Sequence, residues 1–160
     1  MHFQRVHGDH APERVFRSVV NASPTVAIAR GDVCLWDIID NTATVGILTD
    51  TRGVRVLRNV GTLASVRVAG VAEKAGPVTK AGQFREDGFI IQVSGIHAEV
   101  NAEGTVVQDA MAVASSTAGL IETIITPGTP LVAELAGEMG WFMAPRTGAG
   151  TVPVMLKRLL

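Results

Sequence analysis

The sequence predicts an all-β protein with a compact body, a β-barrel or sandwich that is β-tulip-like or jelly-roll-like. Three observations predict this class. Short runs rich in valine, isoleucine and threonine recur along the chain, and clusters of glycine, proline and aspartate separate them. The 160 residues include 17 glycines and 7 prolines, which suits strands joined by tight turns. No alternation of strands with amphipathic helices supports a parallel sheet.

The composition also limits the partners of the chain. Hydrophobic residues make up 47% of the sequence and charged residues 18%, with a mean hydropathy of +0.30. Because charged residues form roughly a quarter of an average soluble domain, we expect another chain to cover part of this surface. No apolar run approaches the roughly 18 residues of a membrane span, and we expect no signal peptide. A net charge of −1 argues against nucleic acid as a partner.

The first 23 residues are predicted to form an N-terminal arm, and residues 24–160 the body. The arm combines histidines and arginines with few large apolar side chains. Residues 12–20 form either a short helix, with Pro12 near its start, or an extended segment. In both cases the arm has too little apolar area to fold alone, so it docks on the body or on a neighbouring subunit. Three histidines in it are interpreted as solvated rather than as metal ligands: His2, His7 and His10.

Apolar runs bounded by turns predict the strands of the first half of the body. These strands are expected at 25–29, 33–36, 44–48, 54–60 and 62–72. The tripeptide Arg30-Gly31-Asp32 is interpreted as a turn between the first two. The arginines at 55 and 58 face water only if their strand bends or lies at a sheet edge. Cys34, the single cysteine, is expected to be a small core residue.

The most strongly patterned segment of the chain is 88–119. It holds an apolar run, 89–100, then a polar turn, a short run at 105–107 and a second apolar run at 111–114. We expect these runs to fold back on one another as a pair or trio of strands. His97 lies in the first run and is interpreted as a packed or interface residue, because spacing places no nucleophile beside it.

A weak internal echo relates two parts of the body. Residues 27–35 and residues 104–112 each contain an apolar run, an aspartate-bearing turn and a second apolar run. Two such elements could occupy related places in one barrel, although the match is short enough to arise by chance.

The C-terminal part predicts strands at 120–126 and 151–156, with a helix or strand at 131–139 between them. The Gly148-Ala149-Gly150 tripeptide is interpreted as a turn, because no lysine stands where a phosphate-binding loop needs one. Trp141 and Phe142 are expected to fill the body or the core of a trimer.

The order of strands and glycines resembles the head-decoration proteins of tailed bacteriophages, over roughly residues 23–132. The segments that carry the resemblance are 88–98, Gly104, Asp109, 114–119 and, upstream, 31–37 and 68–72. The resemblance implies a mostly-β body, often trimeric, that sits outside an icosahedral capsid and clamps neighbouring major capsid proteins. It brings no catalytic residue, cofactor or metal to this chain.

The functional expectation is therefore a non-enzymatic virion structural protein on the outer capsid surface. Its expected partners are the major capsid protein and two further copies of itself, with neither nucleic acid nor a membrane. The expected contact residues are Phe3, Val15, Phe16 and Trp36. Two alternatives remain open: another virion component from the tail or baseplate, and a small-ligand-binding or enzymatic β-barrel.

Overall fold

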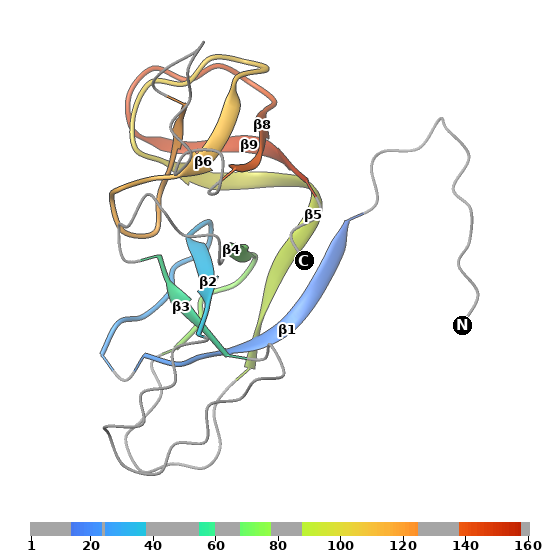
Figure 1. The fold of residues 1–160 in the computed structure, drawn as a ribbon, viewed down its shortest axis with the longest axis vertical. Coiled ribbons are helices and arrows are strands. Elements are labelled where there is room, and N and C mark those ends of the chain that lie inside the picture. Colours follow the sequence, from blue (N-terminus) through green and yellow to red (C-terminus); the bar gives the residue numbers. More distant parts are fainter. Residues whose placement is uncertain are drawn as a thin grey trace, which may run out of the picture.

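The computed structural model describes residues 14–23, 25–37, 55–59, 68–77, 88–124 and 138–157. Every regular element in these residues is a β-strand, which confirms the predicted all-β class (Figure 1). The strands are β1 (Val15–Asn21), β2 (Val33–Trp36), β3 (Arg55–Arg58), β4 (Val68–Ala72), β5 (Gly88–Ala102), β6 (Met111–Ala114), β7 (Ile121–Thr123), β8 (Glu138–Phe142) and β9 (Gly150–Leu156). No helix in the described part of the chain is long and apolar enough to cross a membrane.

The first half of the chain forms a closed five-stranded barrel. Its strands pair in the order β1-β3-β2-β4-β5, and the pairing of β1 with β5 closes the ring. Only β1 and β3 run parallel; the other neighbours are antiparallel. The apolar interior includes Cys34, Val56, Phe89 and Ile91. The predicted core position of Cys34 is therefore confirmed, since its side chain is fully buried.

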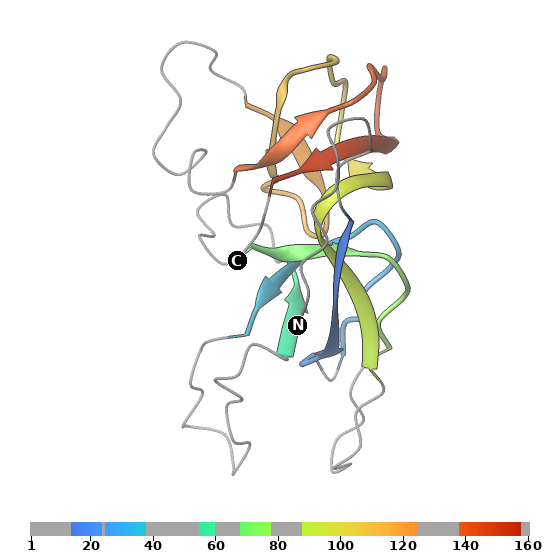
Figure 2. The same cartoon turned by 90° about the vertical axis from the view of Figure 1, so that its right-hand side faces the viewer.

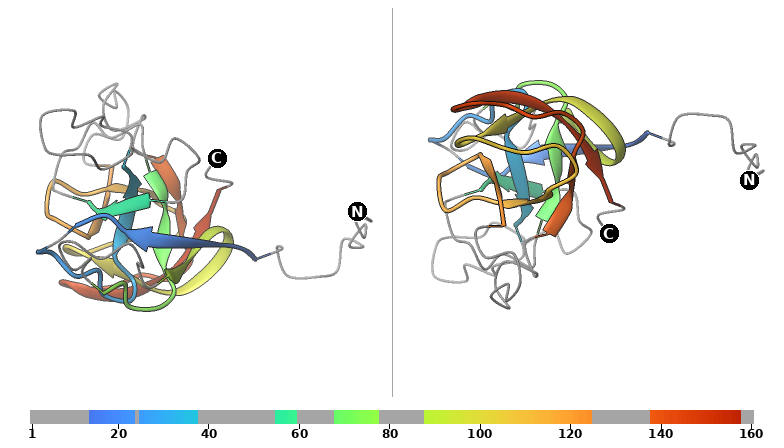
Figure 3. Two further views of the ribbon diagram at one scale, coloured as in Figure 1. Left: turned by 90° about the horizontal axis from the view of Figure 1, so that it is seen from below. Right: turned by 90° about the horizontal axis from the view of Figure 1, so that it is seen from above.

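The second half closes a further ring on the same long strand. Here the order is β5-β7-β6-β8-β9, and the pairing of β9 with β5 completes it. The two halves of the chain stack along the long axis of the molecule (Figure 2). Seen from above, β5 and β9 curve around the upper ring together (Figure 3). The 15 residues of β5 thus supply a wall to each barrel.

The two barrels repeat the same hydrogen-bonding plan. In the first, Cys34 lies opposite Gly70, and a bulge follows at Cys34. In the second, Ala112 lies opposite Gly140, and a bulge follows at the matching place. In both, one strand pair is parallel and joins strands that correspond in order: β1 with β3, and β5 with β7. The described strands therefore form two copies of one topology, with the second half of β5 in the role of β1.

The connecting turns repeat as well. Ile28 forms an isolated bridge with Gly76, and Val106 forms one with Arg146. The turn after each bridge has a residue with positive φ, at 83° and 63°. These residues, Gly31 and Asp109, donate their backbone N–H to Ala72 and Phe142 respectively, both at 2.8 Å. The echo seen in the sequence thus marks corresponding turns, although in two barrels rather than one and with a register shifted by one residue.

The predicted fold-back of segment 88–119 is wrong. β5 pairs with β1, β4, β7 and β9, whereas β7 lies between β5 and β6. β5 instead bends sharply as it passes from one barrel to the other (Figure 1). Gly95, at φ 86°, and an irregularity in pairing between His97 and Val100 allow this bend. The connection 103–110 does not form a tight hairpin turn, because Val106 within it bridges to Arg146 instead.

The other strand predictions fare unequally. Those at 33–36 and 151–156 are confirmed, and the described parts of 54–60, 62–72 and 120–126 contain β3, β4 and β7. Residues 25–29 and 105–107 make only isolated bridges rather than strands. The predictions for 44–48, for 62–67 and for 131–137 lie outside the described residues, and so do the three histidines His2, His7 and His10.

Of the two conformations left open for the end of the N-terminal arm, the extended one is observed. β1 pairs with β5 and β3 and is therefore a wall of the first barrel. Residues 1–13 lie outside the described part, so the division into arm and body at residue 23 stays a prediction.

Candidate interaction surface

The predicted contact residues do not form one group. Phe3 lies outside the described residues. Val15 and Phe16, on β1, are 40% and 45% exposed. Trp36 is instead partly buried against the core of the first barrel, and the Arg17 guanidinium lies 5.2 Å from its ring centroid. Val15 and Phe16 are consecutive residues of β1, successive strand residues face opposite sides, and Trp36 lies on β2, so the structure does not bring these residues to one surface.

A small apolar group lies on the outside of the first barrel, which we call the β1 patch: Phe16 and Ile90. Ile90 is 36% exposed and lies on the strand that pairs with β1. The Arg14 guanidinium is 4.9 Å from the Phe16 ring centroid and is held there by Gln92, whose Oε1 accepts from Arg14 at 2.9 and 3.2 Å. The same guanidinium also pairs with the Glu73 carboxylate at 3.4 Å, so the edge of the patch carries a positioned and partly compensated arginine.

A larger apolar surface runs across the outside of the second barrel. Met111 lies opposite Trp141, Trp141 opposite Met155, and Met155 opposite Ile96. Directly opposed residues point to the same side of a sheet, so these four residues form a continuous line, which we call the Trp141 row. Trp141 is 42% exposed and the other three are half-buried.

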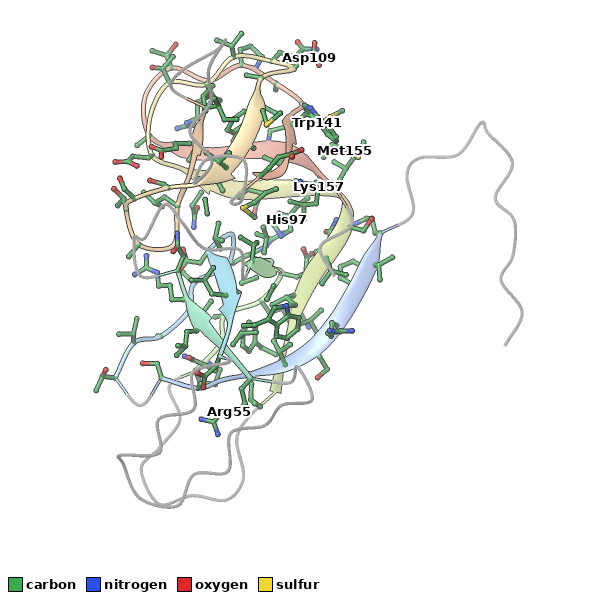
Figure 4. All side chains as sticks on the ribbon, in the orientation of Figure 1. Arg55, His97, Asp109, Trp141, Met155 and Lys157 are labelled. Atoms are coloured by element: carbon green, nitrogen blue, oxygen red, sulfur yellow. The ribbon has the colours of Figure 1, made fainter. Side chains whose placement is uncertain are left out.

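Further groups frame the Trp141 row. Met143, two residues beyond Trp141 along the chain, is 39% exposed. An ion pair at 2.7 Å joins Lys157 to Glu138. Figure 4 shows Trp141, Met155 and Lys157 along one side of the upper barrel. Of the two aromatic residues of β8, Phe142 is fully buried and fills the body, as one of the two expectations has it, whereas Trp141 faces out.

The matching row of the first barrel is covered. By register it consists of Val33, Val71, Gln92 and Phe16. The first three are fully buried. Val33 and Val71 belong to the same hydrophobic cluster as residues inside the second barrel, such as Phe142 and Leu156. The second barrel therefore sits on the outer face of the first, and the same face of the second barrel is left open.

Charged side chains gather where the two barrels meet. His97 is fully buried, and its Nε2 lies 3.1 Å from a Glu73 oxygen. Its Nδ1 accepts the backbone N–H of Glu99 at 3.2 Å, so the neutral ring carries its proton on Nε2, toward Glu73. Burial lowers the pKa of His97, and the Glu73 carboxylate opposes this effect. The interpretation of His97 as a packed residue is confirmed.

Asp32 is a second polar anchor of the junction. It is buried, and its carboxylate lies 2.8 Å from Arg58 Nε. It also accepts hydrogen bonds from the Ala29 backbone at 2.9 Å and the Asn101 side chain at 3.0 Å. The Arg30-Gly31-Asp32 tripeptide is thus a structural turn.

The arginines of β3 do not have the edge position that would let them face water. β3 lies between β1 and β2 rather than at an edge. Its two arginines are instead compensated by carboxylates: Arg55 lies 3.6 Å from Asp37, and Arg58 pairs with Asp32.

A cavity of about 240 Å³ opens on the second barrel, lined by Glu103, Gly104, Thr105, Val106, Glu122, Thr123 and Ile124. Glu103 accepts hydrogen bonds from the hydroxyls of Ser115 and of Thr117, the latter at 2.6 Å. These two bonds lower the pKa of Glu103. The Ser115 hydroxyl is therefore a donor to a carboxylate. The described residues hold no group of three or more side chains suited to a metal ion.

The C-terminal glycine tripeptide is a turn, as predicted. The Arg146 guanidinium donates to the backbone carbonyls of Gly148, Ala149 and Thr151 at 2.9 to 3.2 Å. It thereby occupies the space inside the turn, where a Cβ on Gly150 would collide with it.

The chain matches no protein-family model, and no curated protein matches it significantly. The proposed function therefore rests on the surfaces described above.

Proposed function

We propose that this protein is a virion structural protein that decorates a tailed-phage head. In this function it binds the outer surface of the major capsid protein lattice as a homotrimer and stabilises the head. The observation that carries the proposal is the Trp141 row on the outside of the double barrel, with Trp141 exposed at its centre, because an apolar surface of this kind marks a protein–protein contact.

Two further observations support it. The charged content of 18% leaves the chain with little polar surface, as expected of a protein that is covered by partners. The resemblance to head-decoration proteins covers roughly residues 23–132, which include strands of both barrels, and it implies the same kind of partner. Each subunit contact is weak, and three linked subunits multiply the affinity for a capsid lattice.

Residues 1–23 are proposed to reach an adjacent subunit, with Phe3, Val15 and Phe16 as contacts. β1 ends this segment and is part of the barrel wall. The test deletion therefore stops at residue 13 and leaves β1 whole.

Co-sedimentation with capsids tests the function. The purified chain is mixed with DNA-free heads assembled from the major capsid protein of the same genome, and its mass in solution is measured by light scattering. We expect saturable binding and a mass of three chains. Removal of residues 1–13 should weaken binding while circular dichroism remains unchanged.

Two results would overturn the proposal. A monomer that ignores capsids excludes the decoration function, and binding to purified tails or baseplates in place of heads favours the other virion role. A small molecule that saturates the cavity near Glu103 and shifts the melting temperature would favour the ligand-binding alternative.

A further inference from the structure

The internal repeat shows which surface of the second barrel is left uncovered. In the first barrel, the outer positions Val33 and Val71 are fully buried under the second barrel. Their counterparts in the second barrel, Met111 and Trp141, have no third barrel on them in the described structure. Trp141 stands 42% exposed where Val71 is 0%. This face is therefore an interface between the barrels in the first copy of the topology, whereas the corresponding face of the second copy is open.

The side chains on the open face suit a protein partner. Trp141 and the methionines around it supply a large, adaptable apolar contact, and tryptophan is enriched among the residues that dominate interface energies. The face is bordered by the Lys157–Glu138 pair at 2.7 Å, which is already neutralised. No uncompensated charge would therefore need to be desolvated there among the described residues of this border.

The first barrel offers the complementary surface. In its own row, the one exposed position is Phe16, which is 45% exposed and forms the β1 patch with Ile90. The Arg14 guanidinium lies 4.9 Å from the Phe16 ring centroid and pairs with Glu73 at 3.4 Å, so it offers a planar, charge-compensated surface on which an indole ring can stack. The two patches are on different barrels and differ in chemistry.

We infer that the Trp141 row of one copy docks on the β1 patch of a second copy. This contact joins two different surfaces and is heterologous, so its repetition gives a ring where the rotation between copies closes and an open filament where it does not. A contact between two Trp141 rows would instead form a two-fold dimer. The inference rests on the oligomeric part of the proposed function and names its interface, but it does not depend on capsid binding.

Mixed cysteine cross-linking of the full chain tests the inference. Trp141→Cys and Phe16→Cys are made as separate single variants, purified under reducing conditions, mixed and oxidised mildly. The native Cys34 does not interfere, because its side chain is fully buried. Val26→Cys is the matched control, since Val26 is 43% exposed but belongs to neither patch.

We expect a disulfide-linked dimer from the Trp141→Cys and Phe16→Cys mixture at least tenfold in excess of either variant alone or of a mixture with Val26→Cys. Trp141→Ser should reduce the light-scattering mass toward one chain while its melting curve remains cooperative. Three results overturn the inference: self-linking of Trp141→Cys, an oligomer that no mixture links, and a monomeric wild-type chain.

Failure of the proposed function is a different result. If the mixed disulfide forms but the oligomer does not co-sediment with capsids, the interface stands and the decoration function falls. If capsids bind the chain but the mixture does not cross-link, the function stands and this interface is wrong.

Discussion

Gly70 and Gly140 occupy the same position in the two barrels. Their φ angles are positive, 156° and 153°. Gly70 lies at a bulge opposite Cys34 of β2, and Gly140 lies at a bulge opposite Ala112 of β6. A Cβ at either position would collide with a backbone carbonyl of the neighbouring strand, that of Gln92 or that of Met155. The repeat therefore depends on glycine at one specific point in each half.

Replacement of either glycine by alanine should be strongly destabilising. Because the colliding atom is backbone, we expect Gly70→Ala and Gly140→Ala each to lower the free energy of unfolding by about 2–3 kcal/mol. Denaturant titration measures this. Gly104→Ala is the control, since a Cβ there meets nothing within 4 Å, and it should change stability by about 0.5 kcal/mol or less. Equal losses at all three sites would contradict the collision argument.

Acidification should destabilise the junction through His97. Its pKa in the folded protein lies below the usual value, chiefly because of burial and despite Glu73; Arg14 and Arg30 add to the lowering. The unfolded chain therefore binds the proton more readily, so the stability contributed by neutral His97 is present above about pH 6.5 and is lost as the pH falls below it.

The measurement is the free energy of unfolding at pH 7.5 and at pH 5.5 for wild type and His97→Gln. The wild type should lose more stability than the variant over this interval. The difference between the two proteins therefore reports the contribution of His97. Parallel pH profiles would show that His97 is not the responsible group.

The buried Asp32 carboxylate should matter more than an exposed ion pair of similar length. Asp32→Ala leaves Arg58 without its partner and removes two further hydrogen bonds, so we expect a loss of about 3 kcal/mol. Glu99→Ala breaks the Arg30–Glu99 pair, also at 2.8 Å but about half exposed on both sides. It should cost about 1 kcal/mol or less. Thermal melts that rank the two variants the other way would refute this account.

Cys34 should be chemically silent in the folded protein. Burial raises the pKa of its thiol well above the usual range, and the Asp32 carboxylate raises it further. Because the thiolate is the reactive form, alkylation by iodoacetamide at pH 8 should proceed only in denaturant, as mass spectrometry would report. Rapid labelling of the native chain at Cys34 would show that the first barrel opens under native conditions.

The sequence pattern predicts the strand class well and the strand partners poorly. Val33–Trp36 and the C-terminal strand are recognisable because apolar runs bounded by turns are local signals. The pairing of β5 with four other strands is not local: it depends on a bend at Gly95, and a run of 15 strand residues looks like the start of a hairpin. Pairing across such distances is set by the whole fold.

The candidate surface was only partly predictable for a similar reason. Phe16 is identified from sequence because it belongs to a short, weakly apolar segment. Trp141 is not separable from Phe142 by composition, since both lie in one strand and only their alternation assigns one to each side. The echo between 27–35 and 104–112 is the signal that could have revealed the repeat, and with it the uncovered face.

The sharing of β5 has a consequence for synthesis of the chain. The strands of the first barrel are complete once β5 has emerged, but the outer face that carries Val33 and Val71 receives its cover only when β9, the last strand, is in place. A nascent chain at that stage exposes apolar surface, and such exposed surfaces promote aggregation and misassembly. We therefore expect slow translation of residues 103–150 to lower the soluble yield of the protein.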